Sequence, residues 1–163
     1  MPELEGIEVF EGADRLQKIP LFGTLSYDET NALASIASPE KRARGTVVVE
    51  EEALGVALYV VVKGRARVER SSHEGVDVIG TVSEGELFGE MSLVEDLFTS
   101  ARVVAETDLE LLCIPRRPFE KLIAGNDRLA LKVYRAFCRT LSERLRKANA
   151  LLAAKPGVIS PIT

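Results

Sequence analysis

The sequence is poor in the residues that most catalytic and metal sites need. Its 163 residues include one histidine, His73, which stands in a polar run at 71–75. A lone loop histidine supplies neither the histidine cluster of metal-dependent enzymes nor a Ser-His-Asp triad. A Walker loop and a Gly-x-Ser-x-Gly nucleophile elbow are also missing. We therefore expect no enzyme activity, no catalytic residue, no metal site and no cofactor.

Cysteines and long apolar runs are scarce as well, and acidic residues outnumber basic ones. Cys113 and Cys138 lie far apart with no Cys-x-x-Cys spacing, so we expect thiols in a reducing compartment. The formal net charge of -4 lacks the basic excess that general nucleic-acid or membrane-surface binding requires. The most apolar window, 46–62, is interrupted by three glutamates and is too short to span a bilayer. The N-terminus has no secretory signal. These absences predict a cytoplasmic protein without direct nucleic-acid or membrane contact.

Helical signals stand at both ends of the chain. Residues 13–18 favour a helix, and a capping box from Ser26 to Glu29 predicts the start of a second, which Pro39 ends. A short helix is expected at 117–123. Asn126 then caps a long helix that runs to about residue 153 without an internal Pro or Gly.

The middle of the chain reads as β structure. Short runs rich in β-branched residues are separated by glycines at roughly even spacing. The predicted strands are 47–49, 57–62, 66–69, 76–82, 101–106 and 109–114. Many short strands with glycine turns are typical of a sandwich or barrel, and a jelly roll suits their number. The sequence thus predicts an α+β protein with an antiparallel β jelly roll.

One segment carries a specific signal for a ligand. Residues 85–93, Gly-Glu-Leu-Phe-Gly-Glu-Met-Ser-Leu, read as a strand end, a glycine turn and a short helix. Such a turn leaves backbone N–H groups free for an anion, although it also occurs as plain architecture. Gly89 permits close backbone approach, and Glu90 supplies a carboxylate that accepts hydrogen bonds from hydroxyls.

This segment resembles the phosphate-binding cassette of the cyclic-nucleotide-binding domains, found in bacterial catabolite-activator-type regulators and in cyclic-nucleotide-dependent kinases. The family pattern is Phe-Gly-Glu, two small or apolar residues and Leu, followed by Arg-Ser/Thr/Ala-Ala. The first half is present at 88–93 and the second as Thr99-Ser100-Ala101, with threonine in place of the arginine. In the family that arginine pairs with the cyclic phosphate, and the glutamate holds the ribose hydroxyl. A second departure is Glu52, where the family usually has a turn glycine.

The resemblance implies an organisation of the whole chain. Residues 1–153 form the cyclic-nucleotide-binding-like domain, and 154–163 form a loose tail. Within the domain, N-terminal helices occupy 13–40, the β-roll 44–115, its phosphate cassette 85–105 and C-terminal helices 116–153. No segment for a DNA-reading helix-turn-helix follows the long helix, so we expect the sensory part of such regulators without that module.

The long helix carries a heptad seam. Apolar residues alternate at intervals of three and four over three heptads, the spacing of a two-stranded coiled coil. The seam consists of Leu131, Tyr134, Cys138, Leu141, Leu145, Ala148 and Leu152. One interpretation is an amphipathic helix that packs only on its own domain. The other, implied by the family, is a homodimer that meets along this helix.

Two functions follow from these observations. The first is a dimeric, non-enzymatic sensor of cyclic AMP, cyclic GMP or another phosphorylated ligand, which signals through an unidentified protein partner. The second is a protein–protein interaction module that has lost nucleotide binding. The predicted ligand-binding residues are Gly89, Glu90, Met91, Ser92, Ser100 and Arg102. Arg102 is a conditional substitute for the missing charge, because alternate strand residues share a face; its alternative is a solvent-facing position.

Overall fold

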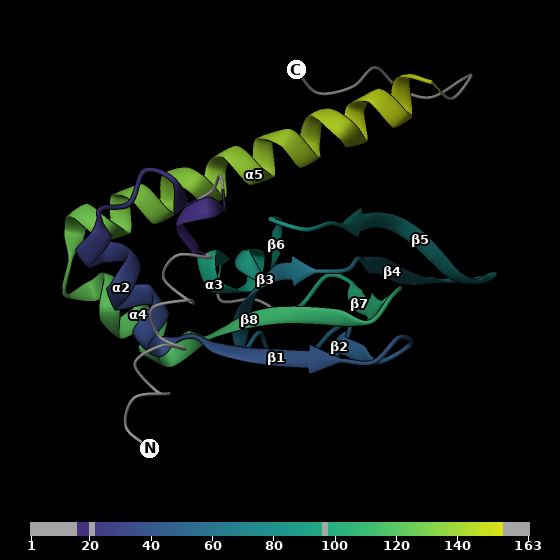
Figure 1. Ribbon diagram of the computed structural model, residues 1–163. Coiled ribbons are helices and arrows are strands. Elements are labelled where there is room, and N and C mark those ends of the chain that lie inside the picture. The colour runs from purple at the N-terminus through teal and green to yellow at the C-terminus, as the bar shows by residue number, and fades with distance from the viewer. Residues whose placement is uncertain (1–15, 20–21, 96–97, 155–163) are drawn as a thin grey trace.

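The chain folds into a two-sheet β-roll with helices gathered at one end (Figure 1). The computed structural model describes residues 16–19, 22–95 and 98–154, without the side chains of 92 and 93. The helices are α2 (Tyr27–Ile36), α3 (Glu90–Glu95), α4 (Arg116–Ala124) and α5 (Asp127–Ala153). The strands are β1 (Ser38–Arg42), β2 (Val47–Val49), β3 (Ala57–Lys63), β4 (Ala66–Ser72), β5 (Gly75–Val82), β6 (Leu87–Phe88), β7 (Arg102–Ala105) and β8 (Leu109–Pro115).

The helix ends follow the predicted caps. Ser26 Oγ accepts the Glu29 N–H at 3.2 Å, and Glu29 Oε1 accepts the Ser26 N–H at 2.9 Å, which completes the capping box. The Asn126 side chain caps α5 by accepting the Leu129 N–H at 3.1 Å. Of the helix expected at 13–18, residues 16–18 are described and helical. Of the tail expected at 154–163, residues 155–163 lie outside the described residues.

Two antiparallel four-stranded sheets form the roll, with strand orders β1-β8-β3-β6 and β2-β7-β4-β5. This confirms the jelly roll. Two of these strands are absent from the predicted set, although a strand end was predicted within 85–93, where β6 lies. β1 is a polar edge strand that contains Pro39, and β6 has two residues, too few for a hydrophobic pattern. The β structure therefore begins at Ser38, where a helical region up to residue 40 was expected.

The β3 strand separates two hydrophobic cores. Leu58 and Val60 face the helices, in a cluster with Leu33, Phe119 and Phe137. The alternate β3 residues face the second sheet, in a cluster that also contains Val82 and Phe88. Burial on both faces explains why this strand reads as a continuous apolar run rather than an alternating one.

The two halves of α5 have different surroundings. Leu129, Val133, Ala136, Phe137 and Thr140 are buried, and all lie in the first half. From Leu141 to Ala153 no residue of the helix is fully buried in the single chain. The helix, about 40 Å long at 1.5 Å per residue, is thus anchored at its N-terminal half, and its distal half runs beside the roll (Figure 1).

Candidate functional site

The cassette turn depends on Gly89. This residue joins β6 to α3 with φ of +92°, a left-handed conformation that favours glycine. A Cβ atom here would lie 2.6 Å from the carbonyl oxygen of Ala57. The cassette backbone therefore packs directly on β3, as expected for a turn that needs close approach. Glu90 follows as the first residue of the six-residue helix α3.

Glu90 is buried and held by the long helix. Its side chain is 1% exposed, and its Oε1 accepts a hydrogen bond from Arg144 Nη1. Arg144 Nη2 donates to the carbonyl oxygen of Leu87, so one guanidinium bridges both ends of the cassette turn. Burial raises the pKa of Glu90 above its ordinary value, although the charge of Arg144 opposes that shift. The carboxylate that the family resemblance assigns to a ribose hydroxyl is thus occupied by a residue of α5.

Thr99 stabilises a neighbouring loop. Its hydroxyl donates to the carbonyl oxygen of Glu50 and accepts the Ala53 N–H at 3.0 Å. Its backbone N–H donates to Ala53 O at 2.8 Å, and its carbonyl accepts the Glu52 N–H at 2.9 Å. Glu52 has φ of +56°, so the turn keeps a left-handed residue although glycine is absent. At the position of the family arginine, this chain therefore has a buried residue that fastens the 50–53 loop.

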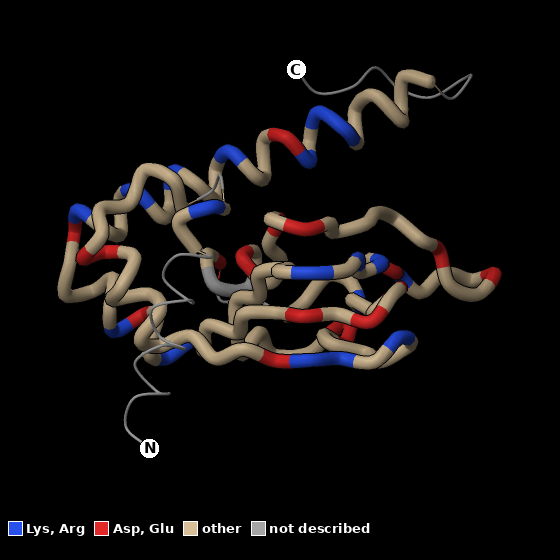
Figure 2. Tube along the Cα trace, in the orientation of Figure 1, with Lys and Arg blue, Asp and Glu red and all other residues tan. Residues whose placement is uncertain are grey.

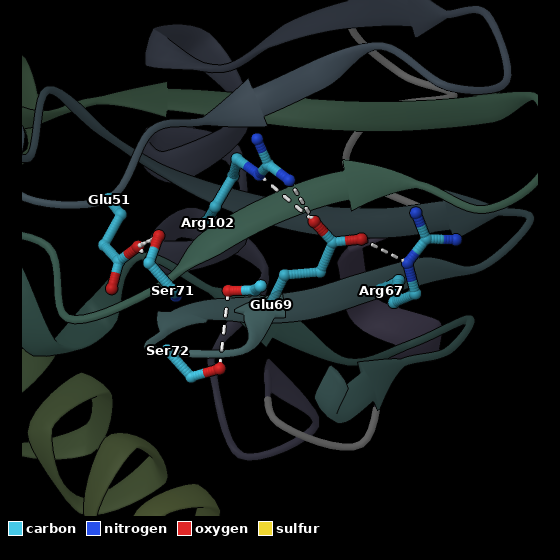
Figure 3. Close-up of polar contacts among 7 residues, drawn as sticks. Glu51, Arg67, Glu69, Ser71, Ser72 and Arg102 are labelled. Atoms are coloured by element: carbon cyan, nitrogen blue, oxygen red, sulfur yellow. Dashed lines mark hydrogen bonds and ion pairs between the residues drawn. The ribbon is translucent and has the colours of Figure 1, made fainter. Parts of the chain in front are cut away.

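Arg102 is paired on the outer face of the second sheet. Its Nη2 lies 2.5 Å from Glu69 Oε2, while Arg67 Nε lies 2.5 Å from Glu69 Oε1 (Figure 3). Both guanidiniums lower the pKa of Glu69, that of Arg102 most. The core that fills the roll takes its β7 residues from Val103 and Ala105, which alternate with Arg102. Arg102, the predicted substitute for the missing charge, is thus already paired with Glu69.

Two of the other predicted ligand residues, Met91 and Ser100, have exposed side chains. Met91 is half exposed on α3, and Ser100 is exposed before β7. Ser92 belongs to α3, but its side chain lies outside the described part of the chain. The assignment of these residues to a ligand remains a prediction.

Sequence reasoning missed Arg144. It is one of seven lysines and arginines on α5, and its sequence neighbours Arg146 and Lys147 carry the same charge. Helical spacing places it outside the apolar seam but does not say which cation reaches a glutamate 54 residues earlier. The one signal in the sequence was the glutamate of the cassette, because a buried carboxylate requires a charged partner.

A cleft of about 320 Å³ lies beside this ion pair, between residues 84–87 and α5. Arg139, Arg144 and Lys147 line it together with Glu143 and the glutamates of the 84–87 segment. Positive and negative side chains are balanced here, and Arg144 is already engaged. Among the described residues, no group of His, Cys, Asp and Glu side chains is arranged to hold a metal ion. Likewise, no helix in the described ranges is long and apolar enough to cross a membrane.

The predicted seam on α5 lies open in the single chain. Leu131, Tyr134, Leu145 and Leu152 are exposed, and Cys138 is an exposed thiol. Val133 and Phe137 lie on another face of the helix and are buried against the domain. The helix therefore uses one face for its own core and presents another apolar face to solvent.

Comparison with known proteins identifies the family. The model of the cyclic nucleotide-binding domain matches residues 39–126. The chain is 34% identical over 131 residues to the cyclic AMP receptor protein of Thermus thermophilus, which covers 80% of this chain and 59% of that protein. It spans between 18% and 59% of the length of three curated relatives that it matches.

Two solved structures have the same fold. A cyclic nucleotide-binding domain from Methylobacillus flagellatus superimposes with a TM-score of 0.79 at 24% identity, covering 95% of this chain and 86% of that one. The second is a mutant regulatory subunit of a cAMP-independent protein kinase A from Trypanosoma brucei, bound to cAMP in its A site. It gives a TM-score of 0.70 at 22% identity over 81% of this chain and 48% of that one. In one of its substitutions an arginine replaces a threonine. This chain belongs to the cyclic nucleotide-binding domain family.

Proposed function

We propose that this family member is a dimeric regulatory domain whose ligand cassette is coupled to its long helix, and which signals through a protein partner. The Glu90–Arg144 ion pair carries the proposal. It joins the carboxylate that the family resemblance assigns to a ribose hydroxyl to the helix that we assign to the dimer. A ligand hydroxyl that hydrogen-bonds to Glu90 would displace the guanidinium and release α5 from the cassette.

The same geometry weakens ordinary cyclic-nucleotide binding. Thr99 fastens a loop, Arg102 is paired with Glu69, and Arg144 is paired with Glu90. Neither Arg102 nor Arg144 is therefore free to contact a cyclic phosphate. Loss of one charge-assisted phosphate contact costs about 1.5–3 kcal/mol, which corresponds to a tenfold to few-hundredfold loss of affinity. Titration calorimetry with cyclic AMP and cyclic GMP tests this expectation, and submicromolar affinity for either would contradict it.

A gain-of-function substitution tests whether the cassette still accepts a phosphate. Thr99→Arg restores a fixed positive charge at the family position, and we expect it to create or strengthen cyclic-nucleotide binding. Because the substitution also removes the hydroxyl contacts to the 50–53 loop, Thr99→Met is the matched control. It has a long uncharged side chain and the same loss. Binding by the arginine variant alone supports the sensor. A folded arginine variant without binding at millimolar nucleotide shows that the cassette is closed.

We propose that the homodimer forms along the α5 seam. The exposed apolar residues from Leu131 to Leu152 support this assignment, since each buried seam leucine contributes roughly 1.5–3 kcal/mol. Leu145→Asp should split or weaken the dimer in sedimentation experiments. Ala150→Asp adds the same charge outside the seam and should leave the mass unchanged. A monomeric wild-type protein at micromolar concentration would remove this part of the proposal.

A second candidate function is an interaction module that binds no nucleotide. The observation that favours it is that Thr99 is already engaged. Its hydroxyl and its backbone groups form hydrogen bonds to the 50–53 loop. In this case the domain keeps its fold for dimerisation and partner docking only. Absence of nucleotide binding in both wild type and Thr99→Arg, with an intact dimer, would decide for this function.

A further inference from the structure

The charge of the protein is divided unevenly between α5 and the rest of the chain. The helix carries seven Lys and Arg residues against two acidic ones, whereas the whole chain has a net charge of -4. Figure 2 shows the basic residues of α5 spaced along the helix from its N-terminal end. The remainder of the protein is therefore strongly acidic.

A basic groove follows the first half of this helix. It has a volume of about 230 Å³ and is lined by Thr24, Arg128, Leu131, Lys132, Arg135 and Arg139. The four cations recur at intervals of four, three and four residues, so they share one side of the helix. Leu131 stands among them and is 67% exposed. The groove thus combines positive charge with an open apolar centre.

Three of these four cations have no anionic partner among the described residues. Lys132 Nζ lies 2.6 Å from Glu29 Oε1, and this contact lowers the pKa of the Glu29 carboxyl although burial opposes the shift. Arg128, Arg135 and Arg139 have no comparable contact in the described ranges. An extended row of unpaired guanidiniums around an apolar side chain favours a ligand that is both acidic and apolar.

The chain itself contains a segment of this composition. Residues 1–14 carry five acidic side chains (Glu3, Glu5, Glu8, Glu11 and Asp14), no lysine or arginine, and the apolar residues Leu4, Ile7, Val9 and Phe10. They lie outside the described part of the structure. The described chain begins at Leu16. This residue is fully buried in the same core cluster as Leu129, Val133 and Phe137 of α5. The acidic segment is therefore tethered next to the helix that bears the groove.

We propose that this acidic N-terminal segment binds the basic groove of α5 in the same chain. From Arg128 to Arg139 the groove extends over twelve residues of helix, roughly 16 Å. A fully extended segment as long as residues 1–14 reaches roughly 45 Å. A short tether keeps the segment at a high effective concentration, so individually weak ion pairs suffice to hold it. Leu4, Ile7 or Phe10 would cover Leu131, the first residue of the predicted seam. The dimer contact would then begin at Tyr134.

A spin label on Glu143→Cys, in a Cys138→Ser background, tests the proposal in the full-length protein. Position 143 is exposed on α5 outside the proposed seam, whereas Cys113 is buried, so a thiol-reactive nitroxide reaches the former. This labelled protein, without charge substitutions in the groove or the segment, is the wild type of the comparison. In the ¹⁵N-labelled wild type, we expect the amide signals of residues 3–11 to lose about half their intensity or more. About 0.5 M salt should restore them, because screening at that concentration acts within a few ångströms. Wild-type signals of full intensity at low salt would overturn the proposal.

Charge variants separate docking from simple proximity to the label. Arg135→Glu with Arg139→Glu should restore the signals, and adding Glu5→Arg with Glu8→Arg should broaden them again. Arg146→Glu with Lys147→Glu makes the same charge change outside this groove and should leave the broadening intact. Equal broadening in all four proteins would contradict the assignment. A mixed sample tests whether the contact is within one chain: one set of chains carries ¹⁵N, and the other carries the spin label at natural isotope abundance. If the broadening is as strong there as within one chain, the segment binds a second copy, and the intrachain proposal is overturned.

Discussion

Two buried glutamates of this protein are held by arginines in contrasting ways. Glu69 lies on the outer face of a sheet between Arg67 and Arg102, and these neighbours lower its pKa. Glu90 lies in the cassette with one arginine, Arg144, from a distant helix, and burial raises its pKa. The first arrangement is redundant and local, whereas the second is single and links two elements. Only the second contact joins the cassette to α5, as the proposed coupling requires.

The largest loss of stability in the cassette should come from a substitution at Gly89. A methyl group there would meet the Ala57 carbonyl at 2.6 Å in a left-handed backbone conformation. We expect Gly89→Ala to lower the free energy of unfolding by roughly 2–4 kcal/mol. Gly80→Ala is the control, because its new Cβ meets nothing within 4 Å. Equal denaturation midpoints for the two variants would contradict this prediction.

Removal of Arg144 should have the next largest effect. Arg144→Met leaves Glu90 buried without its cation, and breaking a fully buried pair costs 3–5 kcal/mol. Because the arginine side chain is 35% exposed, we expect about 1–3 kcal/mol. The pKa of Glu90 should rise further in the variant. The carboxyl then protonates more readily in the folded state, so the loss of stability should shrink as the pH falls toward 4.5. A loss independent of pH would point to packing alone.

Thr99→Val sharpens the comparison at the position of the missing family arginine. The substitution keeps the shape of the side chain but removes two hydrogen bonds to the 50–53 loop. We expect a loss of about 1–2 kcal/mol in chemical denaturation, and no gain of nucleotide binding. An unchanged stability would mean that Thr99 is free to be replaced, which would favour a cassette that tolerates an arginine.

The outer-face cluster should respond least to substitution, and its contribution to stability should be lost at low pH. The pKa of Glu69 is lowered in the folded state, so its contribution to stability is present above pH 4.5 and decreases as the pH falls through its folded value. Glu69→Gln should lower stability slightly at pH 7 and make acid unfolding less steep below pH 4.5. Thermal melts of both proteins between pH 3 and 7 measure this, and parallel curves would contradict it.

The contrast between local and distant contacts also explains which features were predictable from the sequence. The bounds of α5 follow from a local cap and the absence of Pro and Gly, and the cassette turn follows from Gly89. β1 escaped prediction because Ser38–Arg42 is a polar edge strand that contains a proline and pairs only with β8. Strand alternation raised Arg102 as a substitute cation, but its cross-strand partner is Glu69.

The role of Arg144 could not be predicted in this way. Which of several similar helix cations meets Glu90 depends on how α5 packs across the roll, a tertiary property without a sequence period. The family pattern predicts the cassette, and Thr99 marks the position of the missing charge. The structure adds that a cation from α5 is present and already paired with the cassette glutamate.

The most direct test of this account is a pair of double-mutant cycles on unfolding stability. One combines Glu90→Gln with Arg144→Met, and the other combines Glu69→Gln with Arg102→Met. We predict a coupling of about 1 kcal/mol or more for the cassette pair, and a clearly smaller one for the outer pair because Arg67 still contacts Glu69. A cassette coupling within about 0.3 kcal/mol of zero would contradict the claim that Glu90 ties the cassette to α5.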